Sequence, residues 1–208
     1  LGRSGLNAAQ GRAVMRQNKG STLADRCGRC FAQTRYCFCD EIPELRTRVK
    51  ITVVRHWKER LKPSNTARLA DHAIPSLSLI DFGAPGAPPW NHPGLITPDS
   101  ALLFPDASAP EAEAPKHIIV VDGSWAQARK MVNKIPGLKA LPRISIEPPA
   151  TDLVRIRRSP EPGMVSTLEA IAAVLDITEG AGTGDPLRHL YQTAVDATIA
   201  ARGRPLHT

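Results

Sequence analysis

Four cysteines lie close together near the start of the chain, in a pattern typical of a metal site. They form two near pairs with six residues between the pairs: Cys27-x2-Cys30-x6-Cys37-x-Cys39. Cys37 and Cys39 are too close in sequence to pair comfortably with each other in a disulfide, and nothing marks the chain as secreted. Four thiolates so arranged suit the tetrahedral coordination of Zn²⁺, which would hold together a module with almost no core of its own.

Two alternatives use the same thiols. An iron–sulfur cluster has the same ligand chemistry, and the cysteines could instead remain free as redox-active thiols. A closed four-cysteine site has no open position for a substrate, so we assign its metal a structural role rather than a catalytic one. The sequence therefore predicts a structural zinc module over residues 25–45.

One carboxylate, Asp122, stands where an apolar run turns into a helical pattern. The corner and its flanks read Ile118-Ile119-Val120-Val121-Asp122-Gly123-Ser124-Trp125-Ala126-Gln127. Ser124 and Gln127 match a capping box, which indicates a strand, a tight turn and a capped helix. Such a corner exposes the carboxylate of Asp122 at the carboxyl end of a strand, where open α/β sheets bind ligands. Trp125 would pack under the corner or against a planar ligand; a corner built only for stability is the alternative.

The elements that must position these groups alternate along the chain. Short branched-apolar runs predict strands buried on both faces, at residues 50–54, 77–81, 101–104, 117–121 and 143–147. Helical patterns follow at residues 64–73, 124–135, 166–177 and 186–201. This alternation predicts an α/β fold with a mostly parallel sheet and helices on both faces. The expected organisation is a basic arm at residues 1–24, the cysteine module at 25–45 and an α/β domain at 46–208.

The bulk composition favours an anionic partner. The chain has 208 residues, a formal net charge of +7 and a pI of about 9.6, a balance that suits nucleic acid. No run approaches the roughly 18 apolar residues that span a bilayer, and no secretory segment opens the chain, so we expect a cytoplasmic location. No Walker-type loop, dinucleotide fingerprint or Ser-His-Asp arrangement appears.

Several blocks together resemble one family. After the cysteines they are, in order, His56-x-x-Glu59, Pro63-Ser64-Asn65-Thr66-Ala67-Arg68-Leu69, Leu103-Phe104-Pro105, Asp122-Gly123-Ser124-Trp125 with Gln127-Ala128-Arg129-Lys130-Met131, Leu141-Pro142-Arg143, Arg155-Ile156-Arg157 and Ser166-Thr167-Leu168-Glu169-Ala170. The set resembles the DTW-domain family over residues 25–178. Ser124 stands where that family has threonine and keeps the hydroxyl, and Trp57 stands where proline is expected.

The resemblance implies a fold and a reaction. The DTW-domain family comprises tRNA-uridine aminocarboxypropyltransferases related to the SPOUT superfamily, and a trefoil knot is implied only by that relationship. The implied reaction transfers the 3-amino-3-carboxypropyl group of S-adenosylmethionine to N3 of a uridine in tRNA and releases methylthioadenosine. An enzyme must position Cγ of the cofactor and remove the N3 proton. Asp122 is the best candidate base, with Ser124 and Trp125 beside it; otherwise Asp122 caps the helix or holds the corner.

The resemblance also implies a cofactor site. Its candidate residues are Leu103, Phe104, Pro105, Asp122, Gly123, Arg155, Arg157, Ser166, Thr167 and Glu169. Arg155 or Arg157 could clamp the carboxylate of the transferred group through a bidentate fork, or belong to a solvated basic edge strand. Glu169 could meet the ammonium group, or it completes a capping box with Ser166.

Basic and polar residues form the candidate tRNA contacts. They are His56, Lys58, Lys62, Ser64, Asn65, Thr66, Arg68, Arg129 and Arg158. Free N–H groups where a helix opens near Ser64 suit a phosphate, although ordinary capping explains Ser64 and Asn65 equally well. His56 could bond a base or merely anchor a loop. Two rival functions remain at this point: a SPOUT-like RNA methyltransferase and a non-catalytic, zinc-stabilised RNA-binding module.

Overall fold

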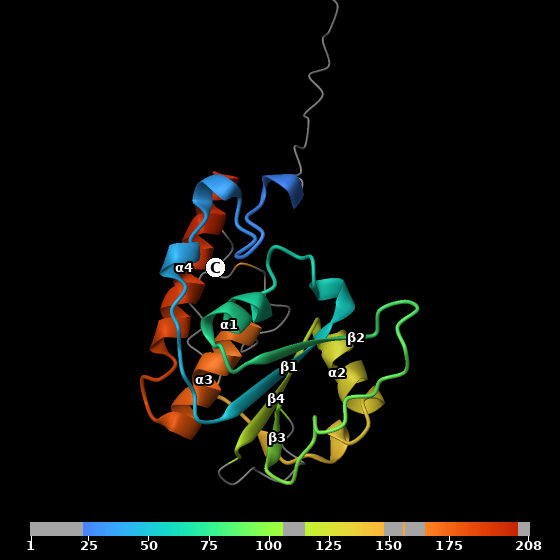
Figure 1. Cartoon of the computed structure of the whole chain (residues 1–208). Coiled ribbons are helices and arrows are strands. Elements are labelled where there is room, and N and C mark those ends of the chain that lie inside the picture. The colour runs from blue at the N-terminus through green and yellow to red at the C-terminus, as the bar shows by residue number, and fades with distance from the viewer. Residues whose placement is uncertain (1–22, 106–114, 148–155, 157–164, 204–208) are drawn as a thin grey trace, which may run out of the picture.

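A five-stranded, all-parallel sheet forms the centre of the molecule (Figure 1). The computed structural model describes residues 23–105, 115–147, 156 and 165–203. The strands lie in the order β2-β1-β4-β3-β5. Their bounds are β1 Lys50–His56, β2 Ser78–Phe82, β3 Ser100–Leu103, β4 His117–Asp122 and β5 Arg143–Ile144. The predicted mostly parallel α/β sheet is confirmed.

Branched-apolar side chains build the two central strands. Ile51, Ile118 and Ile119 are fully buried, and each such side chain contributes about 1.5–3 kcal/mol by leaving water. The β1 and β4 strands pair from Lys50 opposite His117 to Arg55 opposite Asp122. The register therefore places Asp122 opposite Arg55, near the carboxyl end of β1.

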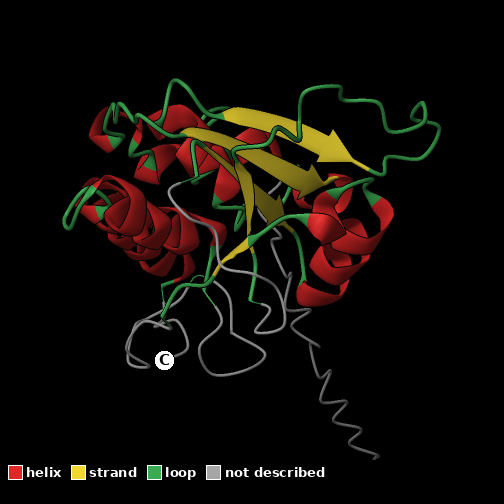
Figure 2. Cartoon of the chain, turned by 90° about the horizontal axis from the view of Figure 1, so that it is seen from below, coloured by secondary structure: helices red, strands yellow, loops and turns green. Residues whose placement is uncertain are grey.

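Helices cover both faces of the sheet, as Figure 2 shows. On one face α1 (Ala67–Ala73), α3 (Thr167–Glu179) and α4 (Asp185–Arg202) share a core with Ile51, Val53 and Ile118. On the other face α2 (Trp125–Lys134) packs over Val54 and Ile119. Alternate strand residues thus enter opposite cores, as the pleat of a strand requires.

Three details of the predicted elements were wrong. The β2 strand is half-exposed instead of buried on both faces, because it lies at the edge of the sheet. The last strand ends at Ile144 instead of residue 147. The first helix begins at Ala67 instead of residue 64, because turns occupy residues 63–66.

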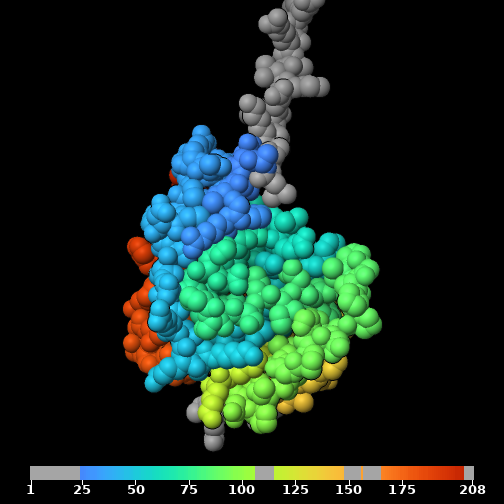
Figure 3. Space-filling model, in the orientation of Figure 1, coloured from blue at the N-terminus to red at the C-terminus, as the bar shows by residue number. Residues whose placement is uncertain are grey.

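The cysteine module packs against the rest of the domain. Short 3₁₀ turns, η1 (Leu23–Asp25), η2 (Thr34–Tyr36) and η3 (Cys39–Glu41), make up most of its regular structure. Its buried Cys30 and Phe38 belong to the same core cluster as α1, α3 and α4, and Figure 3 shows the module in contact with its neighbours. The buried side chains of the module therefore pack in the core of the domain, because the module has almost no core of its own.

The helices α3 and α4 approach each other closely at Gly184. An added Cβ at Gly184 would lie 2.1 Å from the carbonyl oxygen of Ala172, so this glycine lets α4 begin directly against α3.

Within the described residues, no helix combines the length and the apolar character that crossing a membrane requires.

Candidate active site and metal centre

The carboxyl ends of three parallel strands meet at one edge of the sheet. They end at His56, Leu103 and Asp122, on β1, β3 and β4. An added Cβ at Gly123, directly after Asp122, would lie 3.5 Å from Cβ of His56. The strand ends therefore bring together residues from three separate sequence blocks, at the edge where parallel α/β sheets bind ligands.

Asp122 is buried at this edge. Its side-chain oxygens accept two short hydrogen bonds, from Nδ2 of Asn65 at 2.5 Å and from Oγ1 of Thr167 at 2.5 Å. Burial raises the pKa of Asp122, although the bonds from Thr167 and Asn65 act in the opposite direction. The expectation that the corner exposes this carboxylate was wrong, because Asn65, before α1, and Thr167, at the start of α3, cover it with their side chains.

The helix after the corner is capped by other residues. The hydroxyl of Ser124 accepts from the backbone N–H of Gln127, and Oε1 of Gln127 accepts from the backbone N–H of Ser124 at 2.6 Å. The predicted capping box is confirmed, so helix capping does not account for Asp122. Gly123 has little room, since an added Cβ would lie 3.0 Å from Cβ of Gln127.

A second capping box opens α3. Oε2 of Glu169 accepts from the backbone N–H of Ser166 at 2.8 Å, and the hydroxyl of Ser166 accepts from the backbone N–H of Glu169. Glu169 therefore takes the capping role that the sequence left as an alternative. This box holds the first turn of α3 in place, which fixes Thr167 beside Asp122.

Buried charges surround Asp122. Nε of Arg55 donates to Oδ1 of Asp81 at 2.7 Å, and the buried Glu59 pairs with Nζ of Lys62 at 2.6 Å. Both Arg55 and Glu59 act on Asp122 electrostatically, Arg55 lowering and Glu59 raising its pKa. Two ion pairs, one with Arg55 and one with Glu59, thus lie near Asp122 and influence its pKa.

Arg68 lies inside the protein. Its guanidinium stacks on the ring of Phe31 with Cζ 3.4 Å from the ring centroid, and Nη2 donates to the backbone oxygen of Arg60. Burial lowers the pKa of Arg68 to about 10. Phe31 has a positive φ of 62°, unusual for a large side chain. Arg68 therefore joins the cysteine module to α1, a position that the sequence pattern did not indicate.

Three other candidate RNA contacts precede α1. Asn65 and Thr66 are buried, and Ser64 is half-buried. Oδ1 of Asn65 accepts from the backbone N–H of Arg68, while the hydroxyl of Thr66 accepts from the backbone N–H of Leu168 at 3.3 Å. These side chains hold α1, α3 and Asp122 together, and their role toward RNA stays a prediction.

His56 has a defined orientation. Its Nδ1 accepts from the backbone N–H of Lys58 at 3.3 Å, so in the neutral ring Nε2 carries the proton. Burial lowers the pKa of His56, which favours that neutral form. Its ring lies 6.3 Å from the ring of Trp57, and Nζ of Lys58 lies 5.6 Å from the centroid of the Trp57 ring.

The remaining candidates lie in three places. The rings of Phe104 and Trp125 pack against each other with centroids 5.8 Å apart, beside the buried Leu103. Pro105 is exposed, as is Arg129 on α2. The other three candidates, Arg155, Arg157 and Arg158, lie outside the described residues.

The four thiols converge on one point. Their sulfur atoms all lie within 4.8 Å of one another, with Cys27 and Cys39 at 3.5 Å and Cys30 and Cys37 at 3.8 Å. Bonds of about 2.3 Å from Zn²⁺ to the corners of a tetrahedron place sulfurs about 3.8 Å apart. Hydrogen bonds led by the backbone of Cys30 lower the pKa of Cys27 to about 6, whereas burial raises the pKa of Cys30 and of Cys39. The cluster therefore fits a tetrahedral metal ion.

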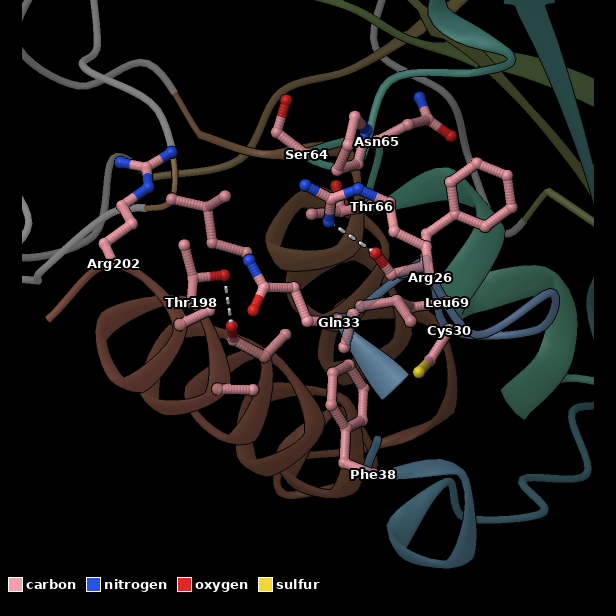
Figure 4. Close-up of a pocket in the computed structure, with 17 residues that line it drawn as sticks. Arg26, Cys30, Gln33, Phe38, Ser64, Asn65, Thr66, Leu69, Thr198 and Arg202 are labelled. Carbon is pink, nitrogen blue, oxygen red and sulfur yellow. Dashed lines mark hydrogen bonds between the residues drawn. The ribbon is translucent and has the colours of Figure 1, made fainter. Parts of the chain in front are cut away.

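A cavity of about 200 Å³ lies between the cysteine module, the turns before α1 and the last turns of α4 (Figure 4). Asn65, the partner of Asp122, forms part of its wall. Its lining also includes Arg26, Gln33, Thr198 and Arg202. Sequence reasoning missed these four residues because they come from distant segments and no local motif contains them.

Comparisons with known proteins identify the family of this chain. A family model, the DTW domain, matches residues 24–199. The chain therefore belongs to the DTW-domain family.

The curated relatives are distant. One, tRNA-uridine aminocarboxypropyltransferase 2 of Drosophila melanogaster, is 25% identical over 88% of this chain and 73% of its own length. The protein of the same name from Mus musculus is 25% identical over 74% of this chain and 56% of its own length. The chain thus spans little more than half of the mouse relative.

A solved structure is also similar. The SAM-dependent rRNA:acp-transferase Tsr3 from Vulcanisaeta distributa is 19% identical, with a TM-score of 0.46, and the match covers 74% of this chain and 80% of that one.

Proposed function

We propose that this protein transfers the 3-amino-3-carboxypropyl group of S-adenosylmethionine to N3 of a uridine in tRNA. Membership of the DTW-domain family supports this assignment, as do the names of the curated relatives. The observation that carries the proposal is Asp122, a buried and doubly hydrogen-bonded carboxylate at the carboxyl edge of a parallel sheet.

The reaction requires one bond to form and one to break. The lone pair of uridine N3 attacks Cγ of the cofactor's methionine portion, and the bond from Cγ to the sulfonium sulfur breaks. Its electron pair stays on sulfur, so neutral methylthioadenosine leaves. The N3 proton must go to a base, and positioning of the reacting atoms supplies much of the rate acceleration.

Asp122 accepts that proton, directly or through one water. Burial raises the pKa of Asp122 above its ordinary value, and a higher pKa makes the ionised carboxylate a stronger base. The donors Asn65 and Thr167 fix its oxygens, and each carboxylate oxygen keeps a second lone pair for the incoming proton.

His56 orients the substrate from the neighbouring strand end. With Nδ1 engaged by the backbone of Lys58, the Nε2–H group donates to a carbonyl of the uracil or to a ribose oxygen. The lowered pKa of His56 keeps the ring neutral, so it donates a hydrogen bond without adding a positive charge beside Asp122.

The cysteine cluster holds a structural Zn²⁺ ion. Its ligands are Cys27, Cys30, Cys37 and Cys39, whose sulfur spacing fits a tetrahedron. When bound, the ion crosslinks a segment with little core of its own. Phe31 of that segment stacks on Arg68 of α1, so the metal also stabilises the contact between the cysteine module and α1.

The net charge of +7 supports tRNA as the substrate, because a basic protein releases counterions when it binds phosphates. Exposed Lys58 on η4 (Trp57–Glu59) and exposed Arg129 on α2 supply phosphate contacts. The proposed location of the protein is the cytoplasm.

One experiment tests the assignment. Unmodified tRNA is incubated with the protein and S-adenosylmethionine, and its nucleosides are analysed by mass spectrometry. Transfer through Cγ adds about 101 Da to uridine and transfer of the methyl group about 14 Da, since positioning decides which carbon reacts. An adduct of about 14 Da would identify a methyltransferase instead. Binding of tRNA without any adduct would identify an RNA-binding module.

A further inference from the structure

The cavity between the cysteine module and α4 has the charge of an anion-binding site. Two arginines, Arg26 and Arg202, line it, and none of its 17 lining residues is an aspartate or glutamate. Arg202 is exposed at the end of α4 and forms no ion pair within the described residues. The lining therefore favours a negatively charged ligand.

The interior of the cavity suits a flat, polar ring. Phe31 and Phe38 contribute aromatic surface, and Leu69 adds an apolar side chain. The side-chain amide of Gln33 forms no hydrogen bond with any described residue, and in Figure 4 it reaches between Thr198 and Thr66. A free amide offers both a donor and an acceptor, which matches the edge of a nucleobase.

The volume of the cavity limits the size of the ligand. A volume of about 200 Å³ lies below the roughly 300–1,000 Å³ of pockets that bury drug-sized ligands. Whole S-adenosylmethionine does not fit such a space, whereas a single base does. Because Arg202 is exposed at the end of α4, a phosphate bound to it would remain near the surface.

The cavity is adjacent to the candidate base. Asn65 lines the cavity and donates to Oδ2 of Asp122, so one side chain separates the two places. Proteins that act on single-stranded RNA splay neighbouring bases into separate pockets. A base bound in the cavity would thus belong to a nucleotide close to the one beside Asp122.

We propose that this cavity binds one unpaired base of the RNA strand flanking the modified uridine, with Arg26 and Arg202 on its phosphate. This subsite rests on the proposed function for the identity of the RNA. It gives the enzyme a means to select the loop in which the uridine lies, because a base in a stacked duplex cannot enter it.

Filling the cavity tests the proposal. Ala197 lines it from α4, and Ala197→Met adds volume while keeping helix propensity. The matched control is Ala200→Met, since Ala200 is exposed on the same helix and does not line the cavity. We expect Ala197→Met to weaken binding of unmodified tRNA about tenfold, the scale of losing one stacked base. The melting temperature and S-adenosylmethionine affinity should stay as in the control.

A second measurement identifies the ligand as a base. Single-stranded RNA carrying the uridine is compared with RNA in which a flanking nucleotide is abasic. One abasic position should weaken binding to the wild-type protein and have no further effect on Ala197→Met. Arg202→Gln should also reduce the slope of log affinity against log salt by about 0.7, the value for one phosphate of a single strand.

The outcomes separate this subsite from the proposed function. Equal tRNA affinity in Ala197→Met and Ala200→Met would refute the proposed subsite, whereas the proposed transfer activity would be unaffected. Loss of S-adenosylmethionine affinity in Ala197→Met alone would assign the cavity to the cofactor and overturn the proposal. Weaker tRNA binding in a protein that forms no aminocarboxypropyl adduct would support the subsite and refute the function.

Discussion

Replacing Asp122 with asparagine separates the chemistry of this carboxylate from its structural role. The substitution keeps the size of the side chain and removes its charge and basicity. Oδ1 of Asn65 already accepts from the backbone of Arg68, so the Asn65 amide keeps its orientation and donates to the new carbonyl oxygen. The Thr167 hydroxyl can rotate to accept from the new amide group, because a hydroxyl both donates and accepts.

The expected change in stability is small. Hydrogen bonds to charged groups contribute about 1.5–3 kcal/mol and neutral ones about 0.5–1.5 kcal/mol. Removing a buried charge offsets part of that difference. We therefore expect the free energy of unfolding to change by less than about 2 kcal/mol, or a melting-temperature shift below about 8 °C for a domain of this size.

Turnover should fall far more. Losing a general base lowers kcat by about 10²–10⁴. Single-turnover assays with saturating tRNA and S-adenosylmethionine measure the step directly. In the wild-type protein, activity should rise with pH through the raised pKa of Asp122, and this limb should vanish in Asp122→Asn. The matched control, Thr167→Ser, keeps the hydroxyl that donates to Asp122 and should retain turnover.

A near-normal kcat in a folded Asp122→Asn protein would refute the reasoning, since a required base cannot be replaced by an amide. Loss of folding in that variant together with normal kcat in the folded fraction would assign Asp122 a purely structural role. Neither outcome would alter membership of the DTW-domain family.

Four further outcomes are expected. Metal analysis should find about one Zn²⁺ per chain, and Cys30→Ser should release it and loosen the module; finding neither zinc nor iron in reduced protein contradicts this. Phe31→Ala should lower stability by about 1–2 kcal/mol through loss of the contact with Arg68, and Phe31→Gly by less because glycine tolerates its positive φ. Binding of tRNA should weaken steeply with salt, and salt-insensitive binding would exclude phosphate contacts. Because the pKa of Asp122 is raised in the folded protein, its protonated form stabilises the fold. This contribution is fully present below about pH 3.9, the ordinary pKa of an aspartate, and is lost as the pH rises through the pKa of the folded state. The stability of the wild-type protein relative to Asp122→Asn, measured by denaturation, should therefore fall over that range.

Local patterns predicted much of the fold. The strand ending at Asp122 and the capping boxes of Ser124 and Ser166 depend on residues within a few positions of each other, so the sequence alone identifies them. The edge position of β2 was not predictable, because apolar runs do not reveal which strand lacks a neighbour.

The surroundings of Asp122 could not be read from the sequence. Its partners come from 57 positions earlier, at Asn65, and 45 positions later, at Thr167. Only the assembled fold places these donors on the carboxylate and buries it. The same reason explains Arg68, which the sequence assigned to phosphate and the fold stacks on Phe31.

The distances along the chain also bear on how the protein folds. Thr52 on β1 and His117 on β4 are hydrogen-bonded although 65 positions separate them. Pairing of such remote strands must close a long loop before it gains contacts, which slows folding. Asp122 acquires its last partner, Thr167, only after α3 has been synthesised and docked. During synthesis on the ribosome, the proposed catalytic carboxylate therefore becomes fully paired late, and a nascent chain would remain inactive until nearly the whole domain has emerged.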